Sequence, residues 1–224
     1  MRRLFDDELN DISANFTEMG MMVSETIEKA VKAFIDHDRS LAQEIIDNDP
    51  KINHREVELE QKSFEMIALY QPVTSDLREI VTILKAVSEL ERMADYARNI
   101  AHATIRVKGH VRVPEIEAEL SEMGNRVRKM VEEMLAAYVK SDDQAARQVA
   151  AKDAKVGEMY DKINEKGISK MERHPETVIG STDYLNVASY LMRIGALVTN
   201  IGEWIVYLNT GEIIELNPES SNLV

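Results

Sequence analysis

The chain has no cysteine among its 224 residues. Disulfides, thiolate metal ligands and cysteine nucleophiles are therefore excluded, and the composition suits a reducing compartment such as the cytoplasm. A secretory signal peptide would become apolar within its first residues, whereas residues 4–8 read Leu-Phe-Asp-Asp-Glu and become acidic. We expect a cytoplasmic location.

Long hydrophobic runs are absent as well. The most apolar stretch, residues 194–208, is interrupted by Asn200 and Glu203 and is shorter than the roughly 20 apolar residues that span a bilayer. The sequence therefore predicts a protein with no membrane-spanning segment.

Basic residues are too few for a protein that coats nucleic acid. The chain carries 27 Lys and Arg against 40 Asp and Glu, a formal net charge of −13, whereas nucleic-acid binding needs cations that neutralise phosphates. We expect no nucleic-acid partner. An acidic surface is suited to cations and to basic partners.

Glycine and proline are scarce, with nine and five residues. Between them, apolar residues recur at spacings of three and four over long segments, which is the pattern of amphipathic helices. Helices of about 30 residues are about 45 Å long, and short turns between them favour antiparallel bundles. Six helices are predicted, at residues 5–37, 41–70, 75–108, 120–138, 144–172 and 185–208.

The two halves of the chain are related in sequence. Met19-Gly20 recurs as Met123-Gly124, and Arg92-Met93-Ala94 recurs as Arg193-Ile194-Gly195, at offsets of 104 and 101 residues. The predicted fold class is all-α, with two tandem, sequence-related antiparallel three-helix bundles. Residues 1–110 form the first bundle and residues 111–224 the second. A single six-helix bundle is the alternative.

Carboxylates intrude on the apolar side of two predicted helices. At about 100° per residue, Glu91 and Asp95 fall in the apolar sector of one helix, and Asp49 and Asn53 fall in that of the preceding helix. If the two helices are antiparallel about Pro72, Asp49 faces Asp95 and Asn53 faces Glu91. Carboxylate metal sites inside helical bundles are built from oxygen-bearing side chains that lie at the same level on neighbouring helices, as these four would. We predict a metal site of hard oxygen ligands, which favour Mg, Mn, Ca or Fe.

Three other interpretations of these residues stay open. Asp49 followed by Pro50 is also a standard helix N-cap and first-turn proline. Glu91 and Asp95 can pair with Arg92 and Arg98 along the surface, or the acids can form a buried network without metal. His102, in the same apolar sector, is expected to be a hydrogen-bonded core histidine rather than a ligand.

Two neighbouring motifs mark the turn before the third helix and that helix itself. They are residues 71–78, Gln-Pro-Val-Thr-Ser-Asp-Leu-Arg, and residues 89–95, Glu-Leu-Glu-Arg-Met-Ala-Asp. Together with the duplicated six-helix layout, they resemble the PhoU family of phosphate-signalling regulators over nearly the whole chain. The resemblance implies negative control of phosphate uptake and phosphate-starvation signalling. The implied partners are the ATPase of a phosphate ABC transporter and its sensor histidine kinase at the membrane.

The same resemblance implies a metal-binding Glu/Asp-x-x-x-Asp motif in paired helices. It maps onto Glu91 and Asp95, with Asp49 and Asn53 as the partner pair. The bound species is then a divalent or trivalent ion, among which Mg, Mn, Fe and Zn stay open. A homodimer is one assembly that the sequence leaves open.

The second half departs from this pattern. At the repeat offsets, Met192 stands where the first half has Glu91, Ala196 stands where it has Asp95, and only Asp153 keeps a carboxylate, at the position of Asp49. One carboxylate is too few to hold a hard cation tightly. We expect the two bundles to differ in metal affinity.

The favoured function is a regulatory binding protein that is not an enzyme, because no nucleophile and base pair or Gly-rich phosphate loop appears in the sequence. A di-metal oxidase of ferritin type is the rival, and it requires Glu-x-x-His motifs on two helices. None of the five histidines has a glutamate three residues before it. A purely structural helical adaptor is a third reading, but it leaves the buried carboxylates unexplained.

Overall fold

The structure, a computed structural model, describes residues 2–107 and 109–216, and these residues contain helices and turns but no strand. The predicted end of the third helix, residue 108, lies outside the described residues. The elements are α1 (Arg2–Asp36), α2 (Arg39–Tyr70), α3 (Thr74–Val107), α4 (Pro114–Val139), α5 (Asp143–Ala150), α6 (Asp153–Arg173), the 3₁₀ turn η1 (Pro175–Thr177) and α7 (Val178–Thr210).

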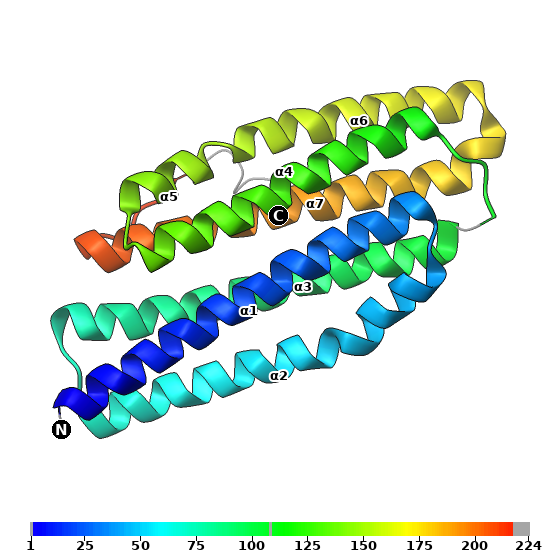
Figure 1. Cartoon of the computed structure of the whole chain (residues 1–224). Coiled ribbons are helices and arrows are strands. Elements are labelled where there is room, and N and C mark those ends of the chain that lie inside the picture. Colours follow the sequence, from blue (N-terminus) through cyan, green and yellow to red (C-terminus); the bar gives the residue numbers. More distant parts are fainter. Residues whose placement is uncertain (1, 108, 217–224) are drawn as a thin grey trace.

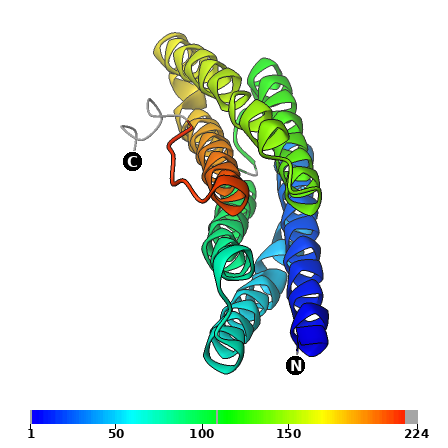
Figure 2. The same cartoon turned by 90° about the vertical axis from the view of Figure 1, so that its left-hand side faces the viewer.

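The helices form two antiparallel three-helix bundles that lie side by side (Figure 1). The first contains α1, α2 and α3, and the second contains α4, the α5–α6 pair and α7. Figure 2 shows α1 and α4 along one side of the molecule and α3 and α7 along the other. The buried apolar residues of both bundles form one continuous cluster. The division at residue 110 therefore stays a prediction about domain boundaries, because the bundles share a core.

Polar side chains set the ends of α2. The Asp38 carboxylate accepts hydrogen bonds from the backbone N–H groups of Ser40 and Leu41, at 2.9 and 3.0 Å, and so caps the helix. The helix continues through Pro50 and ends at Gln71, which has left-handed backbone angles. The capping interpretation of Asp49 is therefore wrong, because Asp38 already supplies the cap 11 residues earlier.

The predicted helix at residues 144–172 is in fact two helices. The α5 helix ends at Ala150, and the Lys152 N–H bonds to the Val149 carbonyl three residues back, so the turn tightens before α6 begins. The break brings the buried Asp153 against the backbone of Gly195 on α7. The spacing of apolar residues does not reveal this break, because the buried positions continue at intervals of three and four residues from α5 into α6.

The α7 helix lies on the side of the second bundle that faces the first, where it contacts α3 (Figure 1). By length and composition alone, η1 and α7 together are long and apolar enough to cross a membrane. However, 56% of the most apolar 18-residue segment of this helix is buried inside the protein. That burial is typical of a core helix. It ends at Gly211, whose φ of 78° suits the left-handed C-cap position that glycine adopts without strain.

Two glycines allow α1 and α4 to approach closely across the junction of the bundles. The branched side chain of Leu135 packs on Gly20, and that of Val31 packs on Gly124. Both pairs are related by the repeat offset of 104, so the recurrence of Met-Gly in the sequence reflects a pseudo-symmetric contact. A Cβ added at Gly124 would lie 2.7 Å from Val31 Cγ2, and a β-branched valine has little freedom to move aside.

The Gly124→Ala substitution should therefore destabilise the protein by about 1–3 kcal/mol through overpacking. Gly157→Ala is the matched control, because a Cβ at that helical position has nothing within 4 Å. It should leave stability unchanged or raise it by up to about 1 kcal/mol. Urea denaturation of both variants measures the difference, and equal effects would show that close approach at Gly124 is unimportant.

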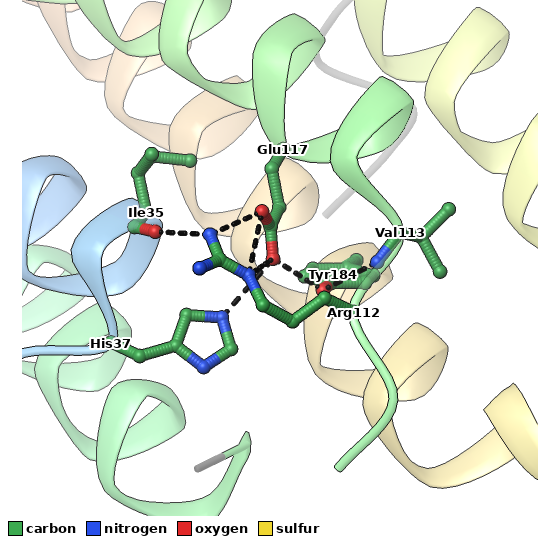
Figure 3. A network of polar contacts seen from close by, with 6 residues as sticks. All are labelled: Ile35, His37, Arg112, Val113, Glu117 and Tyr184. Carbon is green, nitrogen blue, oxygen red and sulfur yellow. Dashed lines mark hydrogen bonds and ion pairs between the residues drawn. The ribbon is translucent and has the colours of Figure 1, made fainter. Parts of the chain in front are cut away.

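A buried polar network joins the connection between the bundles to both of them (Figure 3). The Glu117 carboxylate of α4 accepts hydrogen bonds from Arg112 at 2.6–3.1 Å and from the Tyr184 hydroxyl at 2.6 Å, and it lies 3.1 Å from His37 Nε2. Arg112 also donates to the Ile35 carbonyl at 2.7 Å. Burial acts to raise the pKa of Glu117, but the Arg112, Tyr184 and His37 hydrogen bonds outweigh it and lower that pKa. A charged Glu117 therefore holds the turn after α1, the linker and the start of α7 together.

Candidate metal site

The antiparallel pairing of α2 and α3 brings Asp49 and Asp95 to one guanidinium group. Arg98 donates from Nη1 to Asp49 Oδ2 at 2.5 Å and from Nη2 to Asp95 Oδ1 at 2.7 Å. Asp49 is only 7% exposed, so its charge requires a partner. The arginine therefore supplies positive charge where the sequence predicts a metal ion.

Glu91 and Glu56 add to the negative charge of this region, and both are half-buried. Burial raises the pKa of Glu91, and the charges of Asp95 and Asp49 raise it further. Burial also raises the pKa of Glu56 to about 7, with Glu91, Glu60 and Asp95 contributing. We call Asp49, Glu56, Glu91 and Asp95 the acidic cluster.

Asn53 lies one turn from Asp49 on α2. Its side-chain oxygen is buried and has no hydrogen-bond partner among the described residues. A buried amide oxygen without a partner costs free energy, and such an atom needs a bound group or water to explain it. The unpartnered oxygen and the crowded carboxylates together have the chemistry of a hard-cation site.

The side-chain oxygens of Asp49, Asn53, Glu91 and Asp95 do not form a coordination sphere in this structure. In residues 2–107 and 109–216, no three His, Asp or Glu side chains are close enough together to hold a metal ion. Arg98 pairs with Asp95 as the surface interpretation expects, whereas Arg92 pairs with Glu89 at 3.5 Å rather than with Glu91. Metal ligation by Asp49, Asn53, Glu91 and Asp95 therefore stays a prediction, and it requires Arg98 to move.

His102 is exposed, so its expected role as a core histidine is wrong. It lies two helical turns beyond Asp95 on nearly the same side of α3, and the Asp95 side chain is itself 38% exposed, so this side of the helix is only partly covered. The residue that the sequence analysis undervalued is Arg98. Its spacing of three from Asp95 indicated the surface pair, but nothing in one helix indicated the contact with Asp49.

The equivalent region of the second bundle lacks the acidic cluster. Met192 and Ala196 are half-buried, and Met192 packs against the apolar core. Asp153 is buried against Gly195. The two bundles thus have the same fold but different chemistry on the corresponding helices.

The raised pKa of Glu56 predicts a pH effect on stability. Because the folded protein holds this proton up to about pH 7, against an ordinary pKa of 4.5, stability should fall as pH rises through that window. In chelator-treated protein, Glu56→Gln should therefore raise the melting temperature at about pH 8 and have little effect at about pH 4.

Glu65→Gln is the matched control, since Glu65 is exposed on the same helix. It should change the melting temperature similarly at both pH values. A Glu56→Gln variant whose effect is equally independent of pH would contradict the crowding of the acidic cluster.

The fold and the site define a class: all-helical proteins built from a duplicated three-helix unit, with a carboxylate-rich pair of helices. A family model described as the PhoU domain matches residues 16–104 and 120–205. The chain belongs to the PhoU family.

Similar proteins cover almost the whole chain. A phosphate-specific transport system accessory protein PhoU homolog from Streptococcus pneumoniae is 33% identical over 97% of this chain and 100% of its own length. The homolog of the same name from Clostridium acetobutylicum is 34% identical over 96% and 99%. The crystal structure of the phosphate transport system regulatory protein PhoU from Streptococcus pneumoniae superposes with a TM-score of 0.88 at 32% identity, covering 94% of this chain and 99% of that one.

Proposed function

We propose that this protein is a negative regulator of phosphate uptake and phosphate-starvation signalling. It acts from the cytoplasm by binding the ATPase of a phosphate ABC transporter and its sensor histidine kinase. The observation that carries the proposal is similarity along nearly the full length of both chains to proteins named as accessory to phosphate-specific transport. The acidic charge and the helical surface are compatible with a binding role.

The protein is proposed to have no catalytic activity of its own. A ferritin-type oxidase needs Glu-x-x-His motifs, which the sequence lacks. A structural adaptor would not need the acidic cluster, whose burial of charge costs free energy. A regulatory protein that binds an ion uses the acidic cluster and requires no Glu-x-x-His motif.

Deletion of the gene should raise expression of phosphate-starvation genes in cells grown with abundant phosphate. Transcript levels of the transporter genes measure this, with the deletion strain complemented by the wild-type chain as the control. Expression that is the same with and without the gene would overturn the proposal.

We further propose that Asp49, Asn53, Glu91 and Asp95 hold a divalent or trivalent ion. Such an ion would neutralise the acidic cluster and link α2 to α3. Support comes from the unpartnered Asn53 oxygen and from the raised pKa values of Glu56 and Glu91. Arg98 is then a competitor of the ion, because its two nitrogens bond the same carboxylates.

This competition gives Arg98→Gln two effects of opposite sign. Without metal, the variant should lose about 1–3 kcal/mol of stability, because Asp49 is left buried without its partner. Its affinity for Mn²⁺ should nevertheless rise several-fold, since a competing cation has been removed.

Arg147→Gln is the control, because the Arg147 side chain is 44% exposed and pairs with Asp143 at 3.5 Å on α5, in the second bundle. It should change neither quantity appreciably. Denaturation with a chelator and calorimetric titration with Mn²⁺ measure both. Weaker Mn²⁺ binding in Arg98→Gln than in the wild type would contradict the proposed competition.

A further inference from the structure

A groove of about 530 Å³ runs between α1 and α4, on the side of the molecule where these two helices lie next to each other (Figure 2). Its apolar surface includes Met21 of α1 and Leu135 and Val139 of α4. It lies outside the α2–α3 pair that carries the acidic cluster, so the metal proposal does not use it.

Two large apolar side chains of the groove are exposed. Met21 is 58% exposed and Val139 is 64% exposed, while Leu135 between them is buried against Gly20. Large apolar side chains that are exposed together mark binding surfaces more often than single ones do. Methionine is unbranched and polarizable, and it adapts its shape to a ligand.

The charged rim of the groove is mainly acidic. Glu25 and Glu28 of α1 and Glu132 of α4 line it, against the single cation Lys140. Glu25 and Glu132 pair along their own helices with Lys29 and Arg128, at 2.9 and 2.5 Å. Glu28 has no ion pair within the described part of the chain. Lys29 also reaches Glu44 of α2 at 3.7 Å, and it lines the separate pocket between α1 and α2.

These charges select the kind of occupant. An anionic lipid surface would be repelled by the chain's net charge of −13, to which the carboxylate of Glu28 contributes in this groove. A second copy of this chain would bring another net charge of −13 to an acidic rim. A basic helix with an apolar face satisfies both parts of the groove, in the way that amphipathic helices occupy grooves between other helices.

We propose that the α1/α4 groove binds an amphipathic basic helix of a partner protein. Its apolar face rests on the exposed Met21 and Val139, and its Lys or Arg side chains reach Glu25, Glu28 and Glu132. This inference extends the proposed function, because it names a surface through which a regulatory partner is held.

The test uses the full chain and a fluorescein-labelled peptide of 18 residues. The peptide contains only Leu and Lys, with Leu at the i, i+3, i+4 and i+7 spacing of one helix face, and its matched control has Glu in place of Lys. Fluorescence anisotropy should show saturable binding of the Lys peptide and none of the Glu peptide at the same concentrations.

Paired variants then locate the binding site. Met21→Ser combined with Val139→Ser should weaken binding about tenfold. Phe64→Ser combined with Leu69→Ser removes two exposed apolar side chains from α2 and should change affinity less than twofold. Circular dichroism checks that all variants fold.

A second pair of variants tests the rim. Replacing Glu25, Glu28 and Glu132 by Gln should weaken binding and flatten its dependence on salt. Replacing the exposed Asp6, Asp7 and Asp11 of α1 by Asn removes the same charge elsewhere and should have a much smaller effect. Equal losses in the two triple variants would mean that only net charge attracts the peptide, and would overturn the proposal.

Three other results would also overturn the proposal. They are failure of the Lys peptide to bind, equal affinity of the groove and α2 variants, and a wild-type dimer in sedimentation that Met21→Ser with Val139→Ser dissociates. The last result would mean that a second copy fills the groove. Unchanged phosphate-starvation expression after gene deletion would instead overturn the proposed function and leave these binding measurements intact, so the two failures are distinguishable.

Discussion

The interaction that the first bundle depends on is the pairing of the Arg98 guanidinium with Asp49 and Asp95 across α2 and α3. Asp49 is buried, and an unpaired charge at that depth would be costly. Burial raises the pKa of both Glu56 and Glu91, and the charge of Glu91 raises the pKa of Glu56 further. Because one arginine meets several carboxylates, the region stays rich in negative charge even with the ion pairs formed.

The duplication separates what the fold requires from what the site requires. The pseudo-symmetric contacts of Gly20 with Leu135 and of Gly124 with Val31 hold α1 of the first repeat against α4 of the second. Of the acidic cluster, only Asp49 is repeated, as Asp153, whereas Met192 and Ala196 stand at the positions of Glu91 and Asp95. A carboxylate pair is therefore dispensable for building this bundle, which is why we attribute the acidic cluster to function.

Much of the fold could be predicted from the sequence because it depends on local patterns. Apolar spacing, Pro72 after Gln71 and Gly211 after α7 give the helices and their ends. The break between α5 and α6 was missed because a single tightened turn leaves the apolar stripe in place.

Contacts between helices were predictable only where a short turn fixes their register. Pro72 sets the level of α2 against α3, so Asp49 and Asp95 were expected to lie close together. Other contacts between helices have no such signal: the Glu89 side chain of α3 is 16% exposed and accepts a hydrogen bond from Asn200 at 3.4 Å. That contact joins α3 to α7. The residue pattern of α3 alone does not predict which of its faces the second bundle covers.

The central claim is that a cation is accommodated by the acidic cluster of the first bundle and not by the corresponding region of the second. Amide hydrogen exchange of the full chain, with and without Mn²⁺, tests it most directly. We predict that Mn²⁺ slows exchange in α2 and α3 and leaves α6 and α7 unchanged, and that Asp95→Asn abolishes the difference while Asp153→Asn preserves it. Equal protection of both bundles, or of neither, would contradict the account.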